Sequence, residues 1–275
     1  MGVYIPPNAR AQELLRNMKI NSIPTPVEWI CGKLNIECQI TSEITVEALI
    51  VKGVSSKRTV IAVREGSEYY SRTRFSIAHE LGHFSIPDHL EEAYNCTLAD
   101  LNNYQGSKPG KKKAEIEANE FAAELLMPSN WVSQQIKSND VSMHMIKQIA
   151  NDCDTSLTST ALQVTKYCSD RIAVIYSCEG DVCWFKKAKG FDLYLEKGAL
   201  SKSTLASSFI YSNPSLNQEV KDYVPLNAWC YDERNYNYLI EESLFMPKLR
   251  SSLTILTIPF DEYEEEADPE DPLFW

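Results

Sequence analysis

The sequence of 275 residues predicts an α+β fold: a small mixed sheet with an HExxH helix, a helix-turn-helix-like middle segment and a C-terminal α+β domain. Three observations support this. Short runs rich in valine and isoleucine precede two long helical runs, which favours α+β over alternating βαβ units. A pair of helical segments follows them. Strand-like runs then return after residue 170.

Two helices and three strands are expected first. Asn8–Met18 has Leu14, Leu15 and Met18 on one side, and Pro26–Leu34 opens with a proline near its first turn. The strands expected from their valine and isoleucine content are Ile36–Ile40, Ala48–Val54 and Thr59–Val63.

The next segment contains His79-Glu80-Leu81-Gly82-His83 and ends before Pro87, which predicts a helix. Two histidines four apart lie on one helical face, so their imidazoles can hold one divalent metal. Glu80 can reach a water on that metal. The chain has only four histidines, and finding two of them here favours a metal site over a helix with unrelated histidines.

A hydrolytic zinc site needs a third protein ligand. His89 follows His83 at the metzincin spacing, but Ile86 replaces the glycine that turns the chain back in that pattern. The helix expected at Ala114–Met127 is the better source, because Glu115 and Asn119 share a face. One of them can bind the metal and the other can hold the free ring nitrogen of a ligating histidine. Taken alone, this segment favours an acidic, alanine-rich surface helix.

Together the two motifs, RFSIAHELGHF (Arg74 to Phe84) and EIEANEFAAELLMP (Glu115 to Pro128), resemble the ImmA/IrrE family of metallopeptidases. These are gluzincin-type enzymes that cleave DNA-binding repressors. The resemblance is strong over about residues 45–130 and weaker beyond. It implies metal ligands at His79, His83 and Glu115, a catalytic Glu80, and Asn119 as the partner of a ligating histidine.

Some details stay open. Glu117 is the alternative third ligand. Residues 92–113, which include GSKPGKKK, are expected to form a long polar loop at the rim of the cleft. In the resembled family the substrate lies along a strand beside the active-site helix, and Thr59–Val63 is expected to be that strand.

The expected metal is zinc, with manganese as the alternative because ligand type selects only loosely between them. Glu80 is expected to take a proton from the attacking water and hand it to the leaving amine. A further oxyanion donor is expected, and its weak candidates are Tyr69, Tyr70 and His144.

Met143–Cys153 and Leu157–Cys168 flank Asp154-Thr155-Ser156 and look like a helix-turn-helix, which the resembled family has here. Their lysines and aspartates balance, so phosphate neutralisation is absent and protein recognition or packing is favoured over DNA binding. A hairpin at Arg171–Ser177 and Val182–Ala188 and a strand at Leu253–Phe260 begin and end the C-terminal domain. Some family members carry a sensor domain in this place, but no ligand motif occurs here.

The predicted domains are therefore a zincin-like domain (1–135), a helix-turn-helix-like segment (136–170), an α+β domain of sensor-like type (171–260) and an acidic tail (261–275). The net charge is −11, and the tail holds eight acidic residues and no basic one.

No signal-peptide pattern or apolar run of membrane-spanning length occurs, so a cytoplasmic protein is expected. None of the eight cysteines forms a C-x-x-C pair, and most are expected as free thiols. Cys178 and Cys183 flank a predicted hairpin turn, where a disulfide is the less favoured alternative.

The resemblance implies a metal-dependent endopeptidase whose partner is a helix-turn-helix repressor of the XRE type. Cleavage would relieve repression of stress-response or mobile-element genes. The alternatives are a non-catalytic, metal-stabilised regulator that binds the repressor, and a general peptidase or toxin. Glu80 argues against the non-catalytic regulator, because no structural role is expected for it and a protein without catalytic activity would be free to lose it. No membrane or direct nucleic-acid partner is expected.

Overall fold

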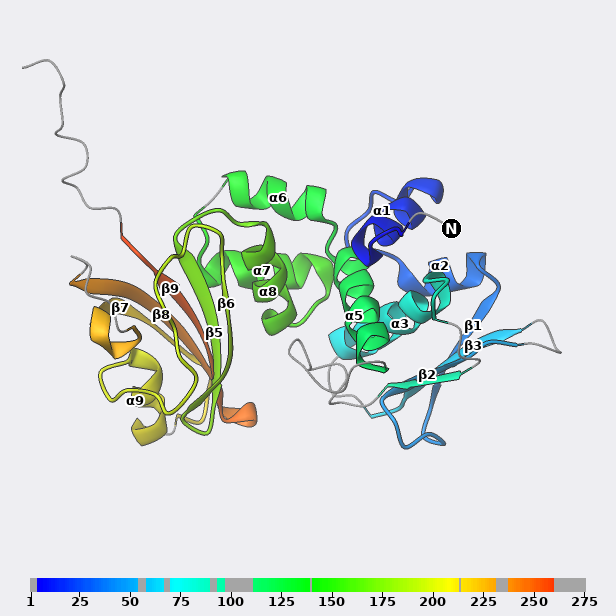
Figure 1. Ribbon diagram of the computed structural model, residues 1–275. Helices are drawn as coiled ribbons and strands as arrows, with labels where there is room; N and C mark the ends of the chain where they lie inside the picture. The colour runs from blue at the N-terminus through cyan, green and yellow to red at the C-terminus, as the bar shows by residue number, and fades with distance from the viewer. Residues whose placement is uncertain are drawn as a thin grey trace, which may run out of the picture. The chain divides into compact units, whose positions relative to one another are not determined.

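The computed structural model describes residues 4–53, 58–66, 70–89, 93–96, 111–138, 140–212, 214–230 and 237–259. The chain forms two compact units, Met1–Tyr167 and Cys168–Trp275. Both combine helices with a sheet, which confirms the predicted α+β class (Figure 1). The acidic tail predicted at 261–275 lies outside the described residues.

A mixed sheet of four strands lies in the first unit, in the order β1-β3-β2-β4. β1 runs parallel to β3, and the other pairs are antiparallel. The strands are β1 (Ile36–Thr41), β2 (Ala48–Val51), β3 (Thr59–Arg64) and β4 (Ala93–Cys96). The first three were expected. β4 falls within residues 92–113, so the expectation of a polar loop there was wrong for these four residues, and also for residues 111–113, which begin a helix. Residues 92 and 97–110 lie outside the described part.

The prediction that the substrate lies along Thr59–Val63 was wrong, because this strand, β3, is inside the sheet. Ile61 of β3 is paired with Cys38 of β1 on one side and with Ile50 of β2 on the other. Both edges of β3 are therefore occupied, and Thr59–Val63 cannot pair with a peptide. Among the described strands, β4 is the end of the sheet that lies beside β2.

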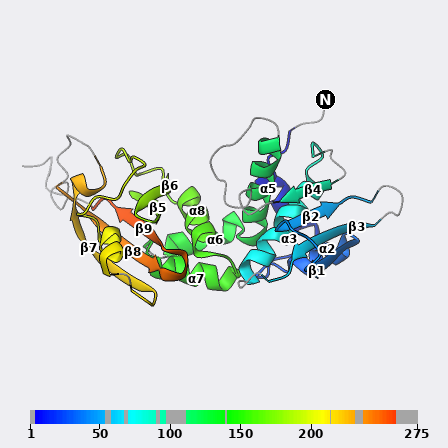
Figure 2. The ribbon, with the colours of Figure 1, turned by 90° about the horizontal axis from the view of Figure 1, so that it is seen from below.

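The helices of this unit build layers over the sheet. α3 packs against β2, β3 and β4 and also against α5, and α5 in turn packs against α1 (Figures 1 and 2). Fully buried apolar side chains fill the space between the layers, including Ile50, Ile61, Leu81 and Phe121. The helices are α1 (Pro7–Asn17), α2 (Val27–Lys33), α3 (Tyr70–Ser85), α5 (Lys111–Leu126), α6 (Ser129–Ser138), α7 (Met143–Cys153) and α8 (Leu157–Tyr167).

A buried carboxylate joins several of these helices. Glu124 of α5 is fully buried and accepts hydrogen bonds from Gln12 (3.0 Å), the Ser129 backbone amide (2.8 Å), Tyr167 (2.7 Å) and Gln163 (3.4 Å). Charged groups are rarely fully buried unless they are paired, and these four donors compensate for the lost hydration. The network connects α1 and α8 to the helix that follows the Glu-x-x-Ala-Asn step.

The predicted helix pair is present as α7 and α8. The Ser142 hydroxyl caps α7 by accepting from the Met145 amide (3.3 Å), and Asp154 ends it in the left-handed conformation (φ 52°). α8 is largely buried, and its Gln163 donates to the Met127 carbonyl (3.0 Å). None of the described helices has the length and apolar character needed to cross a membrane.

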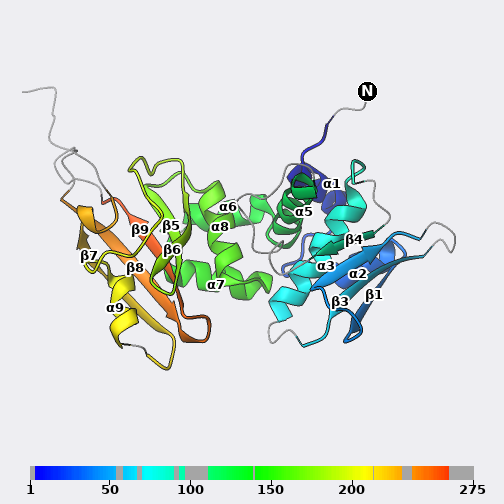
Figure 3. The ribbon, with the colours of Figure 1, turned by 60° about the horizontal axis from the view of Figure 1, so that its bottom comes forward.

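The second unit contains a five-stranded antiparallel sheet in the order β6-β5-β9-β8-β7 (Figure 3). The predicted hairpin is β5 and β6, and the predicted late strand is β9. α9 packs on β8, where the buried Glu241 accepts from the first amides of that helix, Leu205 (3.0 Å) and Ala206 (2.7 Å). The elements are β5 (Ile172–Cys178), β6 (Asp181–Lys187), α9 (Leu205–Ser212), β7 (Gln218–Pro225), β8 (Tyr238–Met246) and β9 (Ser251–Thr257), with 3₁₀ turns at Leu226–Ala228 and Pro247–Leu249.

Cys178 and Cys183 form a disulfide across the β5–β6 turn. The sequence analysis favoured free thiols at these two positions, and the structure contains the disulfide instead. The turn brings the two cysteines together because Glu179 and Gly180 both adopt positive φ, which reverses the chain tightly. The free thiols in the described residues are Cys31, Cys38, Cys153, Cys168 and Cys230.

Candidate metal centre

The two motif helices approach closely at Gly82 and Ala118. A Cβ atom added to Gly82 would lie 3.0 Å from the Ala118 Cα atom, so only glycine allows α3 to pack this tightly on α5. Arg74, about two turns before Gly82, also anchors α3: its buried guanidinium donates to the Thr25 carbonyl (2.8 Å). The glycine and the alanine of the two motifs thus bring one face of α3 against one face of α5.

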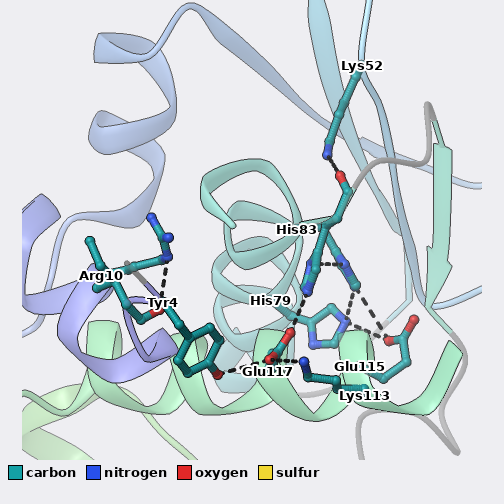
Figure 4. Close-up of polar contacts among 10 residues, drawn as sticks. Tyr4, Arg10, Lys52, His79, His83, Lys113, Glu115 and Glu117 are labelled. Carbon is teal, nitrogen blue, oxygen red and sulfur yellow. Dashed lines mark hydrogen bonds and ion pairs between the residues drawn. The ribbon is translucent and has the colours of Figure 1, made fainter. Parts of the chain in front are cut away.

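Three metal-ligating side chains meet at this contact: His79, His83 and Glu115. The Nε2 atom of His79 lies 3.1 Å from His83 Nε2 and 3.1 Å from Glu115 Oε2, and His83 Nε2 lies 3.6 Å from the same oxygen (Figure 4). All three side chains are buried.

The donor atoms fit a small divalent cation. Ligand atoms about 2.0–2.1 Å from a tetrahedral metal lie about 3.3 Å from one another. The observed separations of 3.1, 3.1 and 3.6 Å bracket this value. Two imidazoles and one carboxylate, with a fourth position left open, form the ligand set of hydrolytic zinc sites.

Electrostatics favour the metal-binding forms of two of these groups. Burial lowers the pKa of His83 to about 4, so its imidazole is neutral near pH 7. Burial alone would raise the pKa of Glu115, but its hydrogen bonds with His79 and His83 outweigh burial and lower the pKa to about 2. A neutral imidazole and an ionised carboxylate are the forms that bind metals.

Glu80 lies beside this cluster and is fully buried. Within the described part of the chain neither of its carboxylate oxygens has a hydrogen-bond partner. Burial raises its pKa to about 8, with Glu115 adding to the rise and His79 opposing it. A buried carboxyl group without partners is unusual in a native structure and calls for a catalytic or ligand-related explanation.

The outer nitrogens of the two histidines also have partners. His79 Nδ1 lies 2.9 Å from Asn119 Oδ1, the contact that the spacing of Glu115 and Asn119 suggested. His83 Nδ1 lies 2.9 Å from His89 Nδ1, and His89 Nε2 lies 3.1 Å from Glu117 Oε2. His89 and Glu117, which we weighed as third ligands, thus lie behind His83 and outside the three-donor cluster.

Sequence reasoning missed one aromatic neighbour. Tyr94 of β4 is buried and stacks on the His83 ring, with centroids 4.0 Å apart and planes 16° apart. Its register partner Ile50 is a core residue, so both side chains face α3. Recognition of β4 in the sequence would have been the only signal for this contact.

The weak oxyanion candidates are scattered. Tyr70 lies in the first turn of α3, where its exposed side chain donates to Glu28 (3.3 Å). His144 is exposed on α7. Tyr69 lies outside the described residues.

An α3–α5 pair that holds two histidines and a glutamate around one point, with a buried carboxyl group beside them, defines a metallopeptidase-type centre. Residues 44–157 match the model of the IrrE N-terminal-like domain, a peptidase family. The resemblance predicted from the two motifs is confirmed over these residues, which are similar to an IrrE N-terminal-like domain. The matched residues include His79, Glu80, His83, Glu115 and Asn119.

A solved structure described as a Mycobacterium tuberculosis transcriptional regulator is similar in fold. Its TM-score is 0.56 at 11% sequence identity, and the alignment covers 90% of this chain and 76% of that chain. At this identity the likeness concerns the fold alone. No curated protein matches the sequence.

Proposed function

We propose that this protein is a zinc-dependent endopeptidase that cleaves a helix-turn-helix repressor of the XRE type. The observation that carries the proposal is Glu80, a buried carboxyl group without partners in the described residues, beside three convergent metal-ligating side chains. A structural helix has no use for such a group, whereas metal-assisted peptide hydrolysis needs a general base at this place.

The proposed roles follow from the contacts. His79, His83 and Glu115 would hold a divalent ion, zinc or alternatively manganese, which would supply Lewis acidity to a water and to the scissile carbonyl. Glu80 accepts the proton that the attacking water loses and delivers it to the leaving amine. Asn119 orients His79 through its Nδ1 atom, which keeps Nε2 directed at the cluster.

β4 is the proposed place of the substrate backbone. It is the end strand beside β2 among the described strands, and its Tyr94 packs on His83. An extended peptide can add to such an edge by main-chain hydrogen bonds, which give affinity with little sequence preference. Cleavage then requires an extended segment, so a folded repressor must expose a loop or a linker.

The class of substrate rests on the family. The resembled enzymes cleave DNA-binding repressors, and the solved structure with a similar fold is described as a transcriptional regulator. Relief of repression of stress-response or mobile-element genes is the proposed outcome. Because a repressor acts on DNA, the proposal also locates the enzyme in the cytoplasm.

The test is incubation of the purified, zinc-loaded chain with XRE-type repressors from the same organism, followed by mass spectrometry of the products. We expect cleavage at one site, which a chelator and Glu80→Gln both abolish. Glu120→Gln, an exposed glutamate on α5, is the matched control and should cleave normally. Release of intact repressor from its operator by wild type and Glu80→Gln alike would replace the proposal with the non-catalytic regulator.

A further inference from the structure

Each candidate ligand histidine must present Nε2 without a proton, and a neutral imidazole does this only when its proton sits on Nδ1. For His79 the partner of Nδ1 is Asn119. For His83 the partner is another imidazole, that of His89, which can either donate or accept. Something beyond His89 must therefore decide which ring holds the shared proton.

We propose that Glu117, acting through His89, fixes the tautomer of His83 that leaves its Nε2 atom free for the metal. Glu117 and His89 are positioning residues in this proposal and not metal ligands. The inference rests on the proposed metal site and adds to it a direction of hydrogen bonding that the two sequence motifs do not specify.

The direction follows from the chemistry of the chain of contacts. A carboxylate only accepts hydrogen bonds, so His89 Nε2 must donate to Glu117 Oε2 across 3.1 Å. A neutral His89 then has an acceptor at Nδ1. His83 Nδ1 must donate to it across 2.9 Å, and His83 Nε2 is left with its lone pair facing His79 and Glu115.

Glu117 is itself held by donors on its other side. The Tyr4 hydroxyl donates to Glu117 Oε1 (3.1 Å), and the Lys113 ammonium lies 3.6 Å from the same oxygen (Figure 4). The side chain is only about one-tenth exposed. These two donors both lie at Oε1, so Oε2 is left as the acceptor for His89 Nε2.

His89 cannot easily turn away from this arrangement. Its backbone carbonyl accepts from the Lys52 ammonium (2.7 Å), and its amide donates to the Ile86 carbonyl (3.1 Å). Its ring is buried against Tyr94, with centroids 5.7 Å apart. The turn after α3 therefore holds His89 by both its backbone and its side chain.

Glu117→Gln is the discriminating substitution, because it keeps the size of the side chain but no longer forces His89 to be the hydrogen-bond donor. An amide can donate to His89 Nε2, which then donates from Nδ1 to His83 and moves the His83 proton to Nε2. We expect the affinity for Zn²⁺, measured by competition with a chromogenic chelator, to fall about 10- to 100-fold. The matched control is Glu120→Gln on the same helix, which should bind as wild type does. Affinity of Glu117→Gln within twofold of the control would overturn the proposal.

A second measurement does not depend on a variant or on activity. Nitrogen-15 spectra of the histidine rings in the metal-free wild type should show His83 protonated at Nδ1, and a proton on Nε2 would overturn the proposal. His89→Gln, which keeps one acceptor and one donor, should retain more zinc affinity than His89→Leu; equal losses would also count against it. If the wild type binds no divalent metal at all, the proposed function fails, whereas unchanged binding by Glu117→Gln defeats only the positioning role.

Discussion

Gly82→Ala tests whether the approach of α3 to α5 sets the metal centre. The new methyl group would lie 3.0 Å from the Ala118 Cα atom and 3.2 Å from its carbonyl oxygen, both of which are backbone atoms. Carbon atoms pack best at about 3.5–4.0 Å, so the two helices must separate by several tenths of an ångström. His79 and His83 move with α3, and Glu115 moves with α5.

The chain contains a matched control in Gly32. This glycine is also helical, is exposed, and has no atom within 4 Å of an added Cβ. Both substitutions gain up to about 1 kcal/mol of helix propensity. Only Gly82→Ala also overpacks a buried contact, which costs about 1–3 kcal/mol. The difference between the two variants in the free energy of unfolding should therefore be about 1–3 kcal/mol.

The same separation should weaken metal binding, because ligand distances tolerate changes of only about 0.2 Å. If the overpacking cost of about 1–3 kcal/mol is paid only when the ligands close around the metal, zinc affinity drops about 5- to 150-fold in Gly82→Ala. The assays are urea unfolding of the metal-free proteins and chelator competition for zinc. Equal stability and equal affinity in the two alanine variants would refute the view that this glycine sets the distance between the motif helices.

Three further predictions concern other parts of the chain. In the metal-free protein, burial raises the pKa of Glu80 from 4.5 to about 8, so its favourable contribution is complete below pH 4.5 and is lost as the pH rises to 8. Urea unfolding between pH 5 and 8.5 should show this loss in wild type and a smaller one in Glu80→Gln; identical pH dependence would show that Glu80 does not cause it. Glu124→Ala should lower the free energy of unfolding by about 3 kcal/mol or more, because the buried Gln163 and the half-buried Gln12 and Tyr167 lose their acceptor. The exposed Glu120→Ala should change it by less than about 0.5 kcal/mol, and a similar effect of both would contradict the role of the Glu124 network. The chain should not bind DNA in a salt-sensitive manner, since α8 is largely buried and the α7–α8 pair is neutral; a gel shift that weakens with salt would disprove this.

The motif helices could be predicted from the sequence because their signals are local. Pro87 and Pro128 mark where the helical runs end, and the four-residue spacing of His79 and His83 needs only helical geometry to become a shared face. The packing of α3 on α5 could be inferred only from the family resemblance. Its physical cause, the approach of Gly82 to Ala118, is visible only in three dimensions.

β4 could not be predicted because nothing local favours it. Its four residues read Ala-Tyr-Asn-Cys within a polar region, and the strand exists because it pairs with β2. β8 was missed for a related reason: Glu241, Glu242 and Ser243 interrupt its apolar residues. Glu241 is buried there because it accepts hydrogen bonds from the first amides of α9, a contact between elements distant in sequence.

The two candidate ligand histidines depend on the rest of the chain in different ways. Asn119, the partner of His79, lies one turn after Glu115 on α5, so a single helix positions both a ligand and a support, and the motif spacing contains that information. The chain of contacts behind His83 comes from separate places: His83 contacts His89 in the turn after α3, His89 contacts Glu117 of α5, and Glu117 contacts Tyr4 in the segment before α1. Substitutions at the N-terminal segment should therefore affect the metal centre through His83 and leave the His79–Asn119 contact intact. In this chain the HELGH motif provides both histidines, but only the fold as a whole determines how the second one presents its lone pair.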